Sequence, residues 1–132
     1  RPICSPDGSQ VVFTSSRDGN REVYTISFHT HSGMGTRLTN NPLSDIVWDW
    51  SPDGTELLFT RGDGSTNNIF IMNQDGTNER QLTTETYGHP DEGTYKTHAT
   101  WSPDGNWILF QTSANDLWKE SLGTLSWSIC EK

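Results

Sequence analysis

The sequence has few basic residues, few aliphatic residues and only two cysteines, and these scarcities exclude several classes of protein. Nine lysines and arginines stand against seventeen acids, so the formal net charge is −8. Binding to nucleic acid needs clustered Lys and Arg against the phosphates, and this balance excludes a nucleic-acid partner. The apolar runs, such as Ile108-Leu109-Phe110, are only a few residues long. A membrane-spanning helix needs about 20 apolar residues, so we expect no membrane span.

The two cysteines, Cys4 and Cys130, lie at opposite ends of the chain and fit no metal-ligand spacing. We expect free buried thiols, with a disulfide within or between chains as the alternative in an oxidising compartment. The chain has no initiator methionine and opens directly on a repeat motif. The removal of a leader peptide or of further repeats is therefore left open.

The content of Leu, Ile, Val and Phe is low, at fewer than one residue in five. Together with the net charge, this composition by itself favours disorder. The aromatic residues argue against disorder, because each buries a large area and the chain has six Trp, three Tyr and five Phe. The regular spacing of motifs described below indicates a folded β protein and not a disordered chain.

The tetrapeptide Ser-Pro-Asp-Gly occurs three times, beginning at Ser5, Ser51 and Ser102. Pro presets φ for a turn, Asp bonds nearby backbone N–H groups, and Gly supplies a positive φ at the exit. Each copy is followed by a segment rich in β-forming residues, and Trp50 and Trp101 precede the second and third copies. The tetrapeptide therefore predicts a hairpin between two strands.

The repetition extends beyond this hairpin to a unit of four strands. A second hairpin of equal length follows in the first two units, with Phe13 and Tyr24 matched by Phe59 and Phe70. The units begin 46 and 51 residues apart, which is typical of the blades of a β-propeller. We expect an all-β chain of about three four-stranded antiparallel blades, at residues 1–40, 41–84 and 85–132, as one partial propeller. Trp50, Trp101 and the Phe of each second strand are the expected filling between blades.

The repeat resembles the WD-like, Ser-Pro-Asp-Gly-containing blades of the TolB β-propeller family. The residues that carry the resemblance are Trp50-Ser51-Pro52-Asp53-Gly54, Arg17-Asp18-Gly19-Asn20, Val23-Tyr24, Asp75-Gly76, Arg80, Leu82 and Thr83. The resemblance implies six blades, of which this chain supplies half, a periplasmic or extracellular location, and protein partners. Related blades also occur in propeller domains of peptidases and in a pectate-type lyase family. We expect a homodimer that completes the ring, with a fragment of a longer chain as the alternative.

Departures from the repeat are candidate functional positions. The stretch from Leu82 to Ser102 is seven residues longer than its counterpart from Leu38 to Ser51. A loop of this composition can line a pocket beside the propeller axis, and a solvated insertion is the equally weighted alternative. A tryptophan also stands in the third unit where the first two have Gln10 and Glu56. The candidate ligand-binding residues are Tyr87, His89, Tyr95, His98 and Trp107.

The four histidines are weak candidates for a metal site. His29 and His31 would point to one face of an extended strand, and the lyase resemblance implies an axial metal near His98, with His89 as its partner. A polar surface loop is the favoured interpretation of His29 and His31. No spacing demands a reaction, so we expect a non-catalytic binding scaffold for a protein or carbohydrate ligand, without a cofactor. The alternatives are a polysaccharide lyase-like domain that uses Mn²⁺ or Ca²⁺, and a peptidase-associated propeller.

Overall fold

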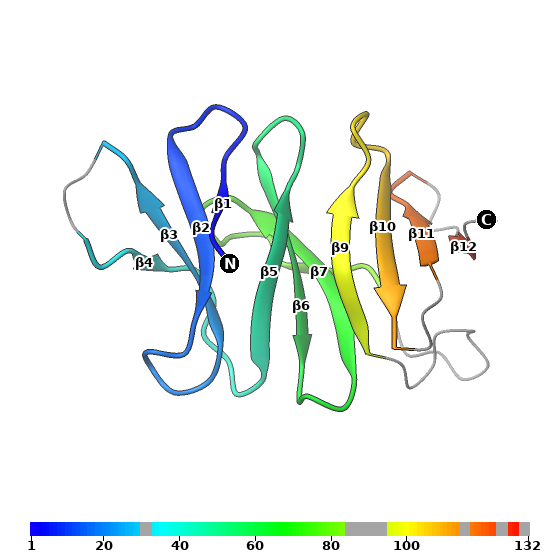
Figure 1. Cartoon of the computed structure of the whole chain (residues 1–132), viewed down its shortest axis with the longest axis horizontal. Helices are drawn as coiled ribbons and strands as arrows, with labels where there is room; N and C mark the ends of the chain where they lie inside the picture. The colour runs from blue at the N-terminus through cyan, green and yellow to red at the C-terminus, as the bar shows by residue number, and fades with distance from the viewer. Residues whose placement is uncertain (30–32, 84–94, 114–116, 124–126, 130–132) are drawn as a thin grey trace.

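The computed structural model describes residues 1–29, 33–83, 95–113, 117–123 and 127–129. These residues form three four-stranded antiparallel sheets, which lie side by side along the molecule (Figure 1), and no helix. The first sheet contains β1 (Ile3–Cys4), β2 (Gln10–Ser15), β3 (Glu22–Ser27) and β4 (Thr36–Arg37). The second contains β5 (Ser44–Trp50), β6 (Glu56–Gly62), β7 (Asn67–Asn73) and β8 (Arg80–Gln81). The third contains β9 (Lys96–Trp101), β10 (Trp107–Thr112), β11 (Leu117–Ser121) and β12 (Trp127–Ile129).

The order of strands in every sheet follows the chain, so each sheet is a meander and the predicted all-β blades are confirmed. The first strands of neighbouring sheets contact one another, β1 with β5 and β5 with β9. Within the part of the chain that is described, the fourth strands make no such contact. The sheets therefore fan outward from their first strands, which is the radial arrangement of propeller blades. We call β1, β5 and β9 the inner strands.

Each Ser-Pro-Asp-Gly segment closes the hairpin that leaves an inner strand. In the first copy the Ser5 hydroxyl donates to Asp7 Oδ1 over 2.6 Å, and the same oxygen accepts the Ser9 N–H over 3.0 Å. Gly8 donates its N–H to the Ser5 carbonyl and has a φ of 71°, which favours glycine. The hydrogen bond from the Ser5 hydroxyl is the main cause that lowers the pKa of Asp7 to about 2. The other two copies repeat these bonds, so the tetrapeptide is explained by the turn.

The core consists of two layers of apolar side chains, one between each pair of sheets. Between the first two sheets the members are Val12, Val23, Val47, Trp50, Leu57, Phe59 and Met72. Between the second and third sheets they are Leu58, Ile69, Ile71, Ala99, Trp101, Ile108, Phe110 and Trp118. The second sheet contributes two consecutive residues of one strand, Leu57 and Leu58, to opposite layers, as the two-residue period of a strand requires. The predicted roles of Trp50, Trp101, Phe59 and Phe110 in packing between blades are thereby confirmed, whereas Phe13 is half-buried and belongs to neither layer.

A buried polar network ties the first sheet to the second. Glu22 is fully buried and accepts hydrogen bonds from the Thr39 hydroxyl, the Asn41 backbone N–H and Arg37 Nη2. The Asn41 amide donates over 2.8 Å to Asp45, and Arg61 donates two bonds to the same carboxylate. Burial opposes ionisation of Glu22, but these donors outweigh it and hold its pKa below the ordinary value. At Asp45 burial prevails over Arg61 and raises the pKa.

Cys4 corrects one expectation, because its side chain is exposed and free instead of buried. It lies on β1, where the first sheet has no neighbour on that side to cover it. Cys130 lies outside the described residues. No helix among the described residues is long and apolar enough to cross a membrane.

Candidate ligand-binding site

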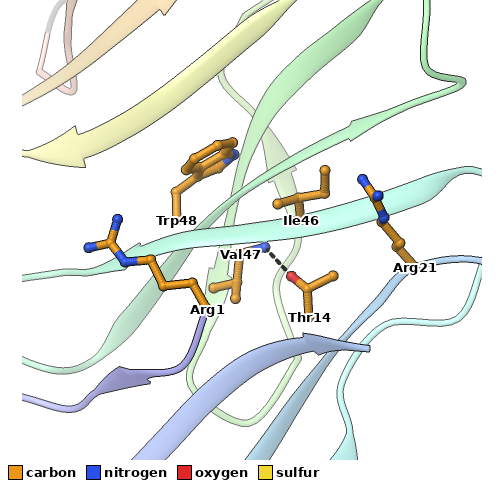
Figure 2. A pocket seen from close by; sticks show the side chains of 6 residues that line it. All are labelled: Arg1, Thr14, Arg21, Ile46, Val47 and Trp48. Carbon is orange, nitrogen blue, oxygen red and sulfur yellow. Dashed lines mark hydrogen bonds between the residues drawn. The ribbon is translucent and has the colours of Figure 1, made fainter. Parts of the chain in front are cut away.

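A hollow of about 330 Å³ opens between the inner parts of the first two sheets (Figure 2). We call it the inner-strand hollow. Its lining residues are Arg1, Thr14, Arg21, Ile46, Val47 and Trp48. Arg1 precedes β1, Thr14 lies on β2, Arg21 precedes β3, and the three apolar residues are consecutive on β5. The hollow therefore depends on the packing of one blade against the next.

The wall on β5 is shaped by a β-bulge at Trp48. Val47 is paired with Phe59 and Asp49 with Leu58, so Trp48 is an extra residue on its strand. The indole Nε1 donates to the Thr60 hydroxyl over 2.9 Å, and the Val47 N–H donates to the Thr14 hydroxyl oxygen over 3.0 Å. These bonds fix the position of the wall and engage the Val47 N–H and the Trp48 indole N–H.

A second bulge lies at the corresponding place in β9. Thr100 is paired with Leu109 and Thr97 with Gln111, so His98 and Ala99 together oppose one residue. His98 has a φ of 53°, a left-handed conformation that is uncommon outside glycine, and its ring is exposed. The imidazole ring lies against the indole of Trp48, with centroids 5.4 Å apart. The bulges thus bring two rings from neighbouring blades together.

A smaller hollow of about 110 Å³ continues past these rings to the third sheet. It is lined by Arg1, Trp48, Asp49, His98, Ala99 and Thr100. Arg1 and Trp48 line both hollows, which makes them neighbours on one surface. Asp49 uses its Oδ2 to accept the Thr100 hydroxyl and the Trp101 N–H, so this carboxylate is engaged in holding the third sheet to the second.

The arginines divide into two groups. Arg37, Arg61 and Arg80 form ion pairs with acids, and Arg17 lies over the rings of Phe13 and Tyr24. Arg1 and Arg21 have exposed side chains and no acidic partner among the described residues. Both line the inner-strand hollow, and Figure 2 shows them on opposite sides of Val47. Unpaired positive charge therefore gathers at this hollow in a chain of net charge −8.

The predicted site residues fall into four groups. His98 lies at the surface of the inner strands, as expected from its place in the sequence. Tyr95 precedes β9 and Trp107 begins β10 beneath Lys119, and neither lines these two hollows. Tyr87, His89 and His31 lie outside the described residues, so no position is assigned to them. His29 is exposed and lines a separate polar hollow with Gln10 and Thr25.

Sequence reasoning missed Trp48, Arg1 and Arg21. A signal for Trp48 was present, because a second tryptophan stands two residues before Trp50 and the third copy has Ala99 at that distance from Trp101. Nothing in the sequence distinguishes the two arginines, since the lack of an acidic partner is a property of the folded chain. Within the described ranges, no group of three or more His, Cys, Asp and Glu side chains is close enough to hold a metal ion.

Comparisons with known proteins agree with this architecture. The model of the TolB beta propeller domain family matches residues 1–128. The Tol-Pal system protein TolB of Anaeromyxobacter dehalogenans is 29% identical over 84 residues, which are 64% of this chain and 19% of that protein. An uncharacterized peptidase, YuxL of Bacillus subtilis, is 28% identical over 120 residues, 87% of this chain and 17% of the peptidase. The chain thus spans about a fifth of the length of these curated relatives.

Solved structures give the same result for the fold. A putative TolB from Agrobacterium tumefaciens superposes with a TM-score of 0.80 at 23% identity, covering 98% of this chain and 44% of that one. TolB from Acinetobacter baumannii superposes with a TM-score of 0.74 at 24% identity, covering 97% and 31%. The three sheets described above therefore share the fold of part of each of these structures.

Proposed function

The chain belongs to the TolB β-propeller domain family, and we propose that it acts as a non-catalytic binding scaffold for a protein or carbohydrate ligand. The observation that carries this proposal is the pair of hollows at the inner strands, which share Arg1 and Trp48. Arg21 lines the inner-strand hollow, and His98 lines the smaller one, where its ring lies against that of Trp48. Aromatic and arginine side chains are the groups most enriched at binding surfaces. A rigid ring of sheets with functional groups at its inner edge is the usual way in which a propeller presents a site.

The relatives support a proposal for the compartment and one for the longer protein. The relative named as a Tol-Pal system protein supports a periplasmic or extracellular location for this chain, in line with the sequence-based expectation. The peptidase relative supports the alternative of a propeller that accompanies a hydrolase in a longer protein. A metal-dependent lyase-like role is a third proposal, which depends on His98 with a partner such as His89.

Ring completion is the second part of the proposal, and the first sheet supports it. The outward face of this sheet carries Val11, Phe13 and Ile26, which are half-buried. Their counterparts one repeat later, Leu57, Phe59 and Met72, are fully buried against the first sheet. The same positions are thus open at the end of the array and covered inside it.

The third sheet has an uncovered face as well, on the side that points away from the second sheet. Leu109 and Lys119 are half-buried and Leu117 is 46% exposed, whereas their counterparts Leu58, Ile69 and Ile71 are fully buried against the third sheet. A blade needs a neighbour on each side to cover both faces. We infer that a second copy of the chain supplies the missing neighbours, since two copies of three blades would make a ring of six with two-fold symmetry. Further blades of a longer chain are the alternative.

The scaffold proposal is tested by binding to arrays of peptides and oligosaccharides. We expect some members of these arrays to bind the native chain. His98→Ala and Trp48→Ala should each abolish most of that binding. His29→Ala is the matched control, because His29 is also exposed but lines a different hollow. Circular dichroism and thermal melting show whether each variant is folded. Binding that is unchanged in the folded His98 and Trp48 variants would reject the inner-strand surface as the site.

A further inference from the structure

We propose that the inner-strand hollow binds an acidic segment of a peptide, with Arg1 and Arg21 engaging carboxylates while an adjacent apolar side chain rests on Ile46 and Trp48. This inference rests on the proposed scaffold function and names the ligand class of the same site. The expected ligand is an extended peptide segment that carries carboxylates next to an aliphatic side chain.

The first argument is the division of the cationic side chains. Lys96 donates to the Asn67 carbonyl, Lys119 lies over Trp107, and four arginines have partners inside the fold. Among the described cationic side chains, Arg1 and Arg21 lack any such partner, and both line the inner-strand hollow, on opposite sides of Val47 (Figure 2). A guanidinium group binds a carboxylate through two parallel N–H donors, so the pair is suited to an anionic ligand.

The second argument is that most of the neutral side-chain donors and the nearby backbone N–H at the hollow are bonded within the fold. The Val47 N–H donates to the Thr14 hydroxyl oxygen and the Trp48 indole N–H donates to Thr60, so the O–H of Thr14 is the neutral donor left among the lining side chains. Ile46 and Trp48, which are half-buried, add apolar surface. A sugar displays hydroxyl groups in several directions and needs neutral donors and acceptors for them. Carboxylates flanking an aliphatic side chain match a wall of this kind better, and this favours an acidic peptide over a saccharide.

The third argument is the size and continuity of the surface. A volume of about 330 Å³ is at the lower end of ligand pockets, which range over roughly 300–1,000 Å³. It therefore suits one or two side chains rather than a folded domain. The smaller hollow shares Arg1 and Trp48 and leads toward His98 and Thr100. An extended segment that enters between the arginines can continue across these inner strands.

Fluorescence anisotropy with a labelled heptapeptide, Gly-Ser-Glu-Leu-Glu-Ser-Gly, tests the inference. The matched peptide has Gln in place of both Glu residues and is expected to bind at least tenfold more weakly. Arg21→Gln and Arg1→Gln should each weaken binding of the acidic peptide about tenfold, as the loss of a charged hydrogen bond predicts. Arg80→Gln is the control of equal charge change, because Arg80 pairs with Glu56 and lines neither hollow. Its affinity should match that of the native chain.

Three outcomes overturn the inference: equal affinity for the two peptides, equal weakening by the Arg80 variant, or binding of an oligogalacturonide in an Arg21-dependent manner without binding of the acidic peptide. The last result would assign the hollow to a saccharide and leave the scaffold function standing. A fourth outcome, a ligand whose binding depends on Trp48 or His98 but on neither arginine, would likewise reject only the acidic-peptide class. If the chain binds none of the peptides and oligosaccharides tested, the scaffold function itself fails.

Discussion

Trp48 and His98 lie ring against ring across the boundary between the second and third sheets, with centroids 5.4 Å apart and planes inclined by 43°. Each belongs to a β-bulge of an inner strand, so the contact depends on two local departures from regular pairing. Bulges re-aim side chains and are frequent beside functional sites. This contact joins the two hollows and makes the inner edge of the blades one surface.

Two substitutions at His98 should separate the effect of its backbone conformation on stability from the effect of its ring. His98→Gly removes the ring at a φ of 53°, where glycine is unstrained, and should change the free energy of unfolding by less than about 1 kcal/mol. His98→Val places a β-branched residue in the same conformation and should cost about 1–3 kcal/mol. Chemical denaturation measures both values. Equal stability of the two variants would contradict the left-handed conformation.

The layer between the first two sheets should carry much of the stability. Phe59 is fully buried there, so Phe59→Ala should lower the free energy of unfolding by about 3–5 kcal/mol. Phe28 is 59% exposed, and Phe28→Ala should change it by less than about 0.5 kcal/mol. Urea titrations of both variants test the assignment of the core. Similar losses for the two would show that the layer is misplaced.

The aspartates of the turns should make stability dependent on acid pH. Hydrogen bonds from Ser5, Ser65 and Ser102 are the main cause that lowers the pKa of Asp7, Asp63 and Asp104 to about 2 from an ordinary value of 3.8. Because the folded pKa is the lower one, this stabilisation is complete above about pH 4 and is lost between pH 4 and pH 2. The variant with Asn at all three positions should be less stable than the native chain above pH 4 and equally stable below pH 2.

Thermal melting at several pH values measures this difference. A constant gap between the two proteins across the whole range would mean that the carboxylate charges contribute nothing at the turns.

The buried network at Glu22 should contribute more to the free energy of unfolding than an ion pair at the surface. Glu22 is fully buried and bonded to Thr39, Asn41 and Arg37, so Glu22→Gln should cost about 1–3 kcal/mol. Glu56 pairs with the exposed Arg80, and Glu56→Gln should cost less than about 1 kcal/mol. Denaturation at pH 7 compares the two. A larger loss for the Glu56 variant would contradict the coupling of the first two sheets through Glu22.

The metal-dependent alternative has a direct test. Ligand binding to the native state raises its stability, so Mn²⁺ or Ca²⁺ bound at His98 would raise the melting temperature. We expect no shift, in the native chain or in His98→Ala. A rise that His98→Ala removes would favour the lyase-like proposal over the scaffold.

Much of the fold was predictable because the repeat encodes it locally. Ser51-Pro52-Asp53-Gly54 determines a hairpin through its own side-chain bonds, and Trp50 before it fills the space toward the first sheet. The outer strands were harder to judge, since β4 and β8 have only two residues each. Their short length follows from the lack of a long apolar run, but their pairing depends on the neighbouring strands.

The site was less predictable, because it depends on relations between sheets. His98 was a candidate because of its position in the sequence. Its partner Trp48 lies fifty residues earlier, and the two rings meet because each residue lies in a β-bulge. Arg1 and Arg21 differ from Arg61 only in what surrounds them after folding. Tyr87, His89 and His31 lie outside the described residues, so their roles stay predictions.

The measurement that tests the central claim most directly is the mass of the chain in solution, by sedimentation or light scattering. If the open faces of the first and third sheets complete a ring with a second copy, the mass should be twice the 14.8 kDa of one chain. Leu109→Arg, on the open face of the third sheet, should reduce the mass to that of one chain, whereas Leu43→Arg, at an exposed position before β5, should not. A stably folded native chain with the mass of a single copy at all concentrations would contradict the claim.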